Sequence, residues 1–143
     1  MDLTNKTILI TGATDGIGKV LAEEFSKLGS NIILLGKNSS KLDAVYDQLD
    51  HSFDSQKHLI LEADLSLLNN ESAHEILRAI SNEYDALDGI IHNAAILGTM
   101  TPLEDYELSK WDEVLNINLR APFLLTKTLK SIVENSTMPR IIF

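Results

Sequence analysis

Short apolar segments alternate with segments of helical periodicity along the whole sequence, and this alternation restricts the fold more than any other feature. The apolar runs that we expect to form strands are residues 6–11, 31–35, 58–61, 87–92 and 140–143. The connections between them are too long for hairpins, so the strands should lie parallel, with the crossover helices packed against the sheet. The sequence therefore predicts an α/β fold with a doubly wound parallel sheet and helices on both faces, truncated after the start of the fifth strand.

The segments between the expected strands carry apolar side chains three and four residues apart, as amphipathic helices do. The first places Ile17, Leu21, Phe25 and Leu28 on one face, and Gly29 follows as a residue suited to a left-handed cap. The other expected helices are a second that begins at Ser40, a third over residues 73–84 and a long fourth over residues 111–133. Residues 97–109 are polar and contain a proline, which predicts a loop with a short helical turn.

The composition fits one globular domain over residues 1–143 with a sizeable core, since 44% of the residues are hydrophobic and 23% are charged. The net charge of -9 argues against nucleic acid as a partner. The chain has no cysteine, which removes disulfides and thiolate ligands, and we expect no metal site. Because neither a signal peptide nor a membrane-length apolar run is present, we expect a cytoplasmic protein with no membrane partner.

A glycine-rich turn joins the first expected strand to the first expected helix. Glycine lets a diphosphate approach the main chain, and the helix N-terminus offers free N–H groups and a positive dipole end. The candidate cofactor-binding residues in this turn are Gly12, Thr14, Asp15, Gly16, Ile17 and Gly18. A tight turn without a ligand is the alternative interpretation, but the strand before and the helix after favour a dinucleotide site. A nucleoside-triphosphate P-loop does not fit, because Ala13 and Val20 stand where that motif needs glycine and a hydroxyl residue.

The spacing Thr-Gly-x-x-x-Gly-Ile-Gly resembles that of the short-chain dehydrogenase/reductase family. Three later segments resemble family motifs in the same order, namely Asp64-Leu65, His92-Asn93-Ala94-Ala95 and the stretch 111–119 with Asn118. The resemblance covers essentially the whole chain, as the amino-terminal part of a family member with a Rossmann-type NAD(P)-binding fold. It implies that Asp64 and Leu65 contact the adenine, that Asn93 lies beside the cofactor ribose with Ala94 also binding the cofactor, and that Asn118 is a catalytic residue.

Two positions depart from the family pattern. His92 replaces an asparagine, and we expect its ring to donate to a neighbouring carbonyl. Ala95 replaces a glycine, which matters only if this residue must adopt a positive φ.

The end of the second expected strand bears on the choice of cofactor. An acidic residue there usually accepts the ribose hydroxyls of NAD and repels the 2′-phosphate of NADP. This sequence has Lys37 instead, which predicts a preference for NADP, with NAD also possible. An ordinary solvated lysine is the alternative, and Asp15 counts against NADP because many NADP-using relatives carry a basic residue at that position.

Pro122 lies inside the long fourth helix, four residues after Asn118. Because proline has no N–H and its ring displaces the carbonyl of residue i−4, the sequence predicts a bend that frees the Asn118 main-chain oxygen. In the family this carbonyl is thought to hold a water of the proton relay. The flanking residues Trp111, Val114 and Leu115 are expected to pack, and this helix often pairs subunits, so we expect a homo-oligomer.

The resemblance also implies a tyrosine and a lysine as the acid/base pair, both after the fifth strand. The only Tyr-x-x-x-Lys here, Tyr106 to Lys110, precedes Asn118 and is rejected as that pair. We therefore expect an NAD(P)-dependent oxidoreductase of carbonyl or alcohol substrates, present without its Tyr/Lys pair and inactive alone. The alternative is a non-catalytic nucleotide-binding or subunit-pairing module, and a methyltransferase fits the Asp64 and Asn93 placements poorly.

Overall fold

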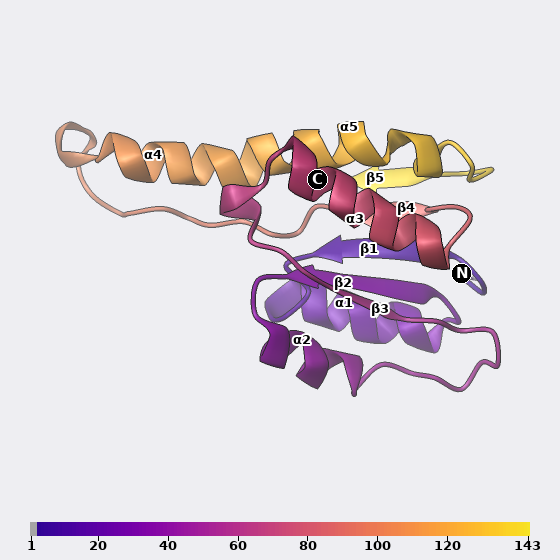
Figure 1. The fold of residues 1–143 in the computed structure, drawn as a ribbon. Helices are drawn as coiled ribbons and strands as arrows, with labels where there is room; N and C mark the ends of the chain where they lie inside the picture. The colour runs from indigo at the N-terminus through magenta and orange to yellow at the C-terminus, as the bar shows by residue number, and fades with distance from the viewer. Residues whose placement is uncertain (1–2) are drawn as a thin grey trace.

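A computed structural model describes residues 3–143 and shows a five-stranded parallel sheet (Figure 1). The strands are β1 (Thr7–Thr11), β2 (Asn31–Gly36), β3 (Leu59–Glu62), β4 (Gly89–Ile91) and β5 (Arg140–Ile142). Their order across the sheet is β3-β2-β1-β4-β5, and every neighbouring pair is parallel. The predicted doubly wound α/β fold is confirmed, because the chain leaves β1 in one direction for β2 and β3 and returns to β4 on its other side.

Helices cover both faces of the sheet, as Figure 1 shows. The helices α1 (Gly16–Lys27) and α2 (Ser39–Tyr46) lie on one face, and α3 (Asn70–Glu83) and α5 (Ala121–Val133) lie on the other. Alternate residues of β1 supply the two cores: Ile8 and Ile10 pack on the α1 side, whereas Leu9 packs on the α3 and α5 side. The strands β1 and β2 therefore bury both of their faces, which accounts for their unbroken apolar runs, whereas β5 at the edge of the sheet is exposed.

The first two helices differ from the sequence expectation in detail. The side of α1 that packs on the sheet is made of the small residues Gly18, Ala22 and Ser26. Ile17 is 72% exposed, so its predicted place on the buried face is wrong. In α2 the predicted start at Ser40 is also wrong, because the cap is Asn38, whose side chain accepts a hydrogen bond from the Lys41 amide at 2.9 Å.

The long fourth helix is continuous but changes its winding near Asn118. It consists of α4 (Leu108–Leu115), a π-helical turn η3 (Asn116–Arg120) and α5, in which Pro122 occupies the first turn. The loop before it contains the predicted short helical turn, η2 (Leu103–Asp105). Among residues 3–143, no helix has the length and apolar character of a membrane span. The cytoplasmic location stays a prediction.

Candidate functional site

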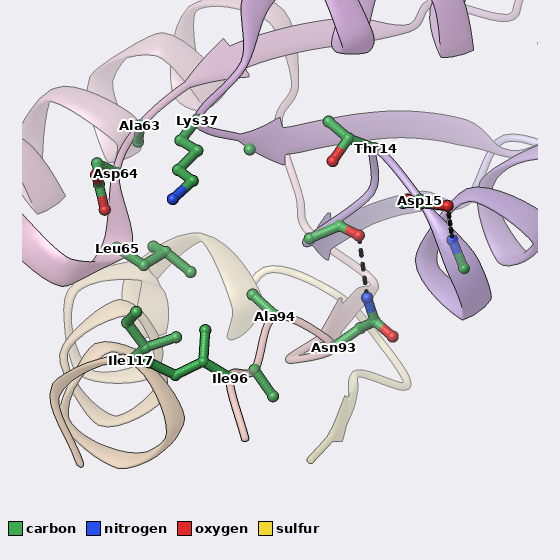
Figure 2. Close-up of a pocket in the computed structure, with 14 residues that line it drawn as sticks. Thr14, Asp15, Lys37, Ala63, Asp64, Leu65, Asn93, Ala94, Ile96 and Ile117 are labelled. Atoms are coloured by element: carbon green, nitrogen blue, oxygen red, sulfur yellow. Dashed lines mark hydrogen bonds between the residues drawn. The ribbon is translucent and has the colours of Figure 1, made fainter. Parts of the chain in front are cut away.

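A cleft opens at the carboxyl ends of β1 and β4, where the order of strands reverses (Figure 2). Open parallel sheets bind ligands at such a switch point, because the loops that leave neighbouring strands diverge there. The cleft has a volume of about 540 Å³. The residues that line it are Gly12, Thr14, Asp15, Gly16, Gly36, Lys37, Ala63, Asp64, Leu65, Asn93, Ala94, Ala95, Ile96 and Ile117. All the predicted site residues except Ile17, Gly18 and Asn118 are among them.

The three glycines of the turn are required for three different reasons. Gly12 has a φ of 65°, and a Cβ there would lie 2.8 Å from the Cα of Ala94. Gly18 has an ordinary backbone, but its Cβ would lie 2.5 Å from both the Asn93 Nδ2 and the Gly12 carbonyl oxygen. Gly16 has a φ of 52° and no other atom within 4 Å of a Cβ position, so it borders open space in the cleft. Of the three glycines, only Gly16 therefore leaves space that a ligand can occupy.

Asn93 ties the loop after β4 to the glycine turn. Its Nδ2 donates to the carbonyl oxygens of Thr11 and Gly12, each at 3.1 Å. The Thr11 hydroxyl in turn accepts a hydrogen bond from the Ala94 amide at 3.0 Å. The segment that follows β4 is thereby held against the turn that follows β1, and the floor of the cleft is built from both.

The amino end of α1 borders the cleft at Asp15 and Gly16. The Lys19 amide bonds to the Asp15 carbonyl oxygen at 3.3 Å, which starts the helical ladder. The amides before Lys19 have no helical carbonyl to bond with. The Asp15 carboxylate accepts a hydrogen bond from the Gly16 amide at 2.7 Å and caps the helix, while its side chain stays exposed. This end of the cleft can hold an anion through main-chain dipoles.

Lys37 and Asp64 face each other at the other end of the cleft (Figure 2). The pKa of the Asp64 carboxyl is held below its usual value by hydrogen bonds from the Ser66 hydroxyl and amide, with a smaller contribution from the positive charge of Lys37. Asp64 also caps the short helix η1 (Leu65–Leu67), whose first residue forms an apolar wall of the cleft. A cation and a carboxylate are thus presented beside an apolar surface.

The Asn118 side chain does not line the cleft but holds one of its walls. Its Oδ1 accepts a hydrogen bond from the Ile96 amide at 2.9 Å, and its Nδ2 donates to the Ile96 carbonyl oxygen at 2.9 Å. The expectation placed Asn118 in a catalytic role through its main-chain oxygen, whereas the side chain here is a main-chain clamp. Ile96 lines the cleft, and so does Ile117, which precedes Asn118 on the helix.

The two departures from the family pattern differ in their effect: Ala95 causes no strain, whereas the Nδ1 of His92 is buried without a hydrogen-bond partner among the described residues. Among residues 3–143, Asn5 is the one non-glycine residue with a positive φ, so Ala95 is accommodated without strain. His92 is 91% buried, and its Nε2 lies 2.9 Å from the hydroxyl of Thr126. The expected carbonyl partner is therefore wrong, since the partner is a hydroxyl. Burial lowers the pKa of His92 to about 4, which keeps the ring neutral.

Several cleft residues were not predicted from the sequence. Gly36 and Ala63 are small residues at the ends of β2 and β3, and Ile96 and Ile117 supply apolar surface. Gly36 carries a usable signal, because a glycine directly before Lys37 at a strand end leaves room for Thr14, whose Cγ2 would lie 3.1 Å from a Cβ. The two isoleucines have no signal beyond their hydrophobicity.

Tyr106 and Lys110 lie away from the cleft, as expected. Tyr106 ends η2 and packs over Gly98, where its hydroxyl oxygen would lie 2.3 Å from a Cβ. Lys110 is on α4 and forms an ion pair with Glu113 at 2.9 Å. Within residues 3–143, no three His, Asp or Glu side chains come together as the ligands of a metal ion would.

Comparisons with known proteins agree with this geometry. Residues 6–143 match the short chain dehydrogenase family. The chain is 32% identical to the uncharacterized oxidoreductase YciK of Escherichia coli, over 99% of this chain and 56% of that protein. It is 32% identical to the 3-oxoacyl-[acyl-carrier-protein] reductase FabG of Aquifex aeolicus, over 87% of this chain and 49% of that protein.

Solved structures give the same result. A chain from Escherichia coli CFT073, described as a short chain dehydrogenase and complexed with NADPH, superposes with a TM-score of 0.90 at 33% identity. The match covers 98% of this chain and 58% of that one. The present chain thus spans about half the length of the relatives it matches. Because the family match extends over nearly all of the sequence, the chain belongs to the short-chain dehydrogenase/reductase family.

Proposed function

We propose that this chain is the cofactor-binding part of an NADP(H)-dependent oxidoreductase. The observation that carries the proposal is the open space beside Gly16, bordered by the amino end of α1, in a cleft that ends at Lys37. A diphosphate fits there because residue 16 is a glycine and has no side chain to occupy the space. At Gly12 and Gly18, by contrast, the position of a Cβ is closely surrounded by other atoms of the protein.

The remaining parts of a dinucleotide have complementary surfaces in the cleft. The apolar side chain of Leu65 and the carboxylate of Asp64 suit an adenine ring and its amino group. Lys37 suits the 2′-phosphate of NADP(H) as a point charge. The Nδ2 of Asn93 is engaged with Thr11 and Gly12, which leaves its Oδ1 to accept a ribose hydroxyl. A relative with the same fold binds NADPH, which supports the same class of cofactor here.

The bound nicotinamide would supply or accept the hydride exchanged with a carbonyl or alcohol substrate. What this chain contributes is the binding and orientation of that cofactor, with Asn118 holding the segment at residues 93–96. We propose that residues 1–143 bind the cofactor without turnover, because no tyrosine and lysine pair reaches the cleft within the described residues. The proposed substrate class is a small-molecule carbonyl or alcohol.

We also propose that the chain pairs with a second copy through α4 and α5. The apolar side chains exposed along this helix lie at helical spacing on one side. They are Leu108, Trp111, Leu115, Leu119 and Phe123. Trp111 packs edge-on against Tyr106, with the ring centroids 6.4 Å apart, but stays 53% exposed. A subunit contact accounts for such a surface better than solvent does.

Titration of the purified chain with NADPH and with NADH tests the cofactor proposal. We expect saturable binding of both, with NADPH bound about tenfold more tightly, and Lys37→Ala should remove that difference while it leaves NADH binding unchanged. Lys41→Ala, a lysine on the exposed side of α2, is the matched control. Equal affinity of the unaltered chain for the two cofactors would contradict the preference, and binding of neither would contradict the proposed function.

A further inference from the structure

The π-helical turn η3 makes contacts to both walls of the cleft. π-helical turns inside α-helices are rare and are frequent at functional sites, because the extra residue redirects neighbouring side chains. Here Asn118 holds Ile96 on one wall through two hydrogen bonds of 2.9 Å. Ile117 is 91% buried and also lines the cleft. Arg120, the last residue of the turn, reaches the other wall.

Arg120 contacts the end of η1. Its Nη1 donates a hydrogen bond to the Leu68 carbonyl oxygen at 2.9 Å, across 52 residues of sequence. Leu68 is the carboxyl cap of η1, and its amide donates to the Leu65 carbonyl oxygen at 3.4 Å. Leu65 in turn forms the apolar wall of the cleft next to Asp64. The guanidinium therefore anchors the short helix at the end opposite to the cleft.

Among the hydrogen bonds of the described residues, this one joins η1 and its cap to the long helix. A three-residue 3-10 helix has little stability of its own, since its internal hydrogen bonds are few and poorly aligned. The position of Leu65 and Asp64 must then depend on contacts from outside η1. A charged donor on a main-chain carbonyl is a strong contact of that kind.

We propose that Arg120 is a positioning residue for the adenine end of the cleft: it holds η1 at the distance from Ile117 that an adenine ring requires. The inference rests on the proposed function, because it assumes that an adenine nucleotide occupies the cleft. Arg120 itself does not line the cleft, so it acts through Leu68 and η1 and not by contact with the ligand. Its effect should accordingly be the same for adenine nucleotides with and without a 2′-phosphate.

The test compares Arg120→Met and Arg120→Lys in the full chain, with ADP-ribose and 2′-phospho-ADP-ribose as probes in a calorimetric titration. Arg120→Met should weaken both probes by the same factor, about tenfold, since it retains the aliphatic stem and removes the donors. Arg120→Lys should restore affinity to within about threefold, because one ammonium donor suffices for one carbonyl. Arg78→Met is the control, because it makes the same charge change at an exposed arginine on α3 that lies 4.0 Å from Glu75. It should leave both affinities unchanged.

Amide hydrogen exchange provides a readout that does not depend on the ligand. Arg120→Met should speed exchange at Leu67 and Leu68, whose amides bond within η1, and leave the amides of β1 protected. If Arg120→Met does not fold, Arg120→Gln, which retains a shorter donor, serves for the same comparison. A larger loss for 2′-phospho-ADP-ribose than for ADP-ribose would overturn the proposal, because it would show a charge effect on the ligand. Unchanged affinities in a chain that binds both probes would overturn the proposal alone, whereas no binding by the unaltered chain would overturn the proposed function as well.

Discussion

Asn118 and Ile96 are joined by a reciprocal pair of hydrogen bonds, in which the side-chain amide of Asn118 pairs with both main-chain polar groups of Ile96. The two residues are 22 positions apart, and the pair fixes the segment after β4 to the π-helical turn. The asparagine amide carries its acceptor and its donor side by side, so it can pair with the main-chain N–H and C=O of one residue at the same time. Asparagine at this position thus has a structural role in addition to any catalytic one.

The reciprocal pair predicts that Asn118→Asp destabilises the chain. The carboxylate keeps the acceptor for the Ile96 amide, but it places a second acceptor against the Ile96 carbonyl oxygen. Because the pair is exposed, we expect a loss of about 1 kcal/mol in the free energy of unfolding, measured with urea at pH 7. Asn116→Asp, on the same turn, makes the same charge change and is the control. Equal effects of the two substitutions would contradict the account.

The different surroundings of Gly16 and Gly18 predict opposite failures. Gly18→Ala places a Cβ 2.5 Å from the Asn93 Nδ2 and from the Gly12 carbonyl oxygen, and should lower the free energy of unfolding by about 1–3 kcal/mol. Gly16→Ala meets no protein atom and carries the strain of a positive φ alone, about 1 kcal/mol. It should instead weaken NADPH binding at least about tenfold, since its Cβ enters the cleft. Thermal unfolding and titration of both variants separate the two effects, and full NADPH affinity in Gly16→Ala would be inconsistent with the proposed diphosphate position.

Burial of His92 predicts a pH dependence of stability. The pKa of His92 falls to about 4 in the folded chain from 6.5, because the ring is buried, so between these values the unfolded chain binds more protons than the folded one. The contribution of His92 to the free energy of unfolding is therefore fully present above pH 6.5 and is lost as the pH falls toward 4. The loss between pH 7 and 4.5 is about 2 kcal/mol. His58, whose pKa burial also lowers, acts in the same direction.

Urea unfolding at pH 7 and pH 4.5 measures the contribution of His92 through a comparison with His92→Gln. The glutamine can retain a bond to the Thr126 hydroxyl and does not titrate. The drop in stability should be smaller in the variant by about 2 kcal/mol. If the two proteins lose the same stability over this range, His92 is not the group responsible.

The exposed apolar side of α4 and α5 predicts self-association. Leu119 and Phe123 are each 64% exposed on successive turns, and Leu119→Lys should convert a dimer into a monomer. Sedimentation equilibrium up to about 100 µM measures this, with Leu97→Lys, in the loop before η2, as the control. A monomeric unaltered chain over that range would rule out the proposed pairing of this isolated chain.

The order of elements was predictable from the sequence because the central strands β1 and β2 are buried on both faces and the helices between the strands have apolar sides. Local detail was less predictable. Ile17 fits an apolar stripe at helical spacing, but the small residues Gly18 and Ala22 are the ones that α1 buries, and Ile17 is exposed. Asn38 displaces Ser40 as the cap of α2 because its side chain reaches the Lys41 amide.

The site was predictable where main-chain geometry determines it and less so where distant segments meet. The glycine turn and Lys37 have local signatures, since each follows a strand. By contrast, the hydrogen bond from Arg120 to Leu68 joins residues with no common local pattern. The clamp of Asn118 on Ile96 depends likewise on how the long helix crosses the end of β4, which the sequence does not specify.

The central claim is that the main-chain amides of the glycine turn hold the diphosphate of a dinucleotide. Amide chemical shifts during a titration of the ¹⁵N-labelled chain with NADPH test this most directly. We predict large, saturable shifts at Gly16, Ile17 and Gly18, with small ones at the amides of α3. Shifts confined to other parts of the sheet, or a spectrum of the folded chain that NADPH leaves unchanged, would contradict it.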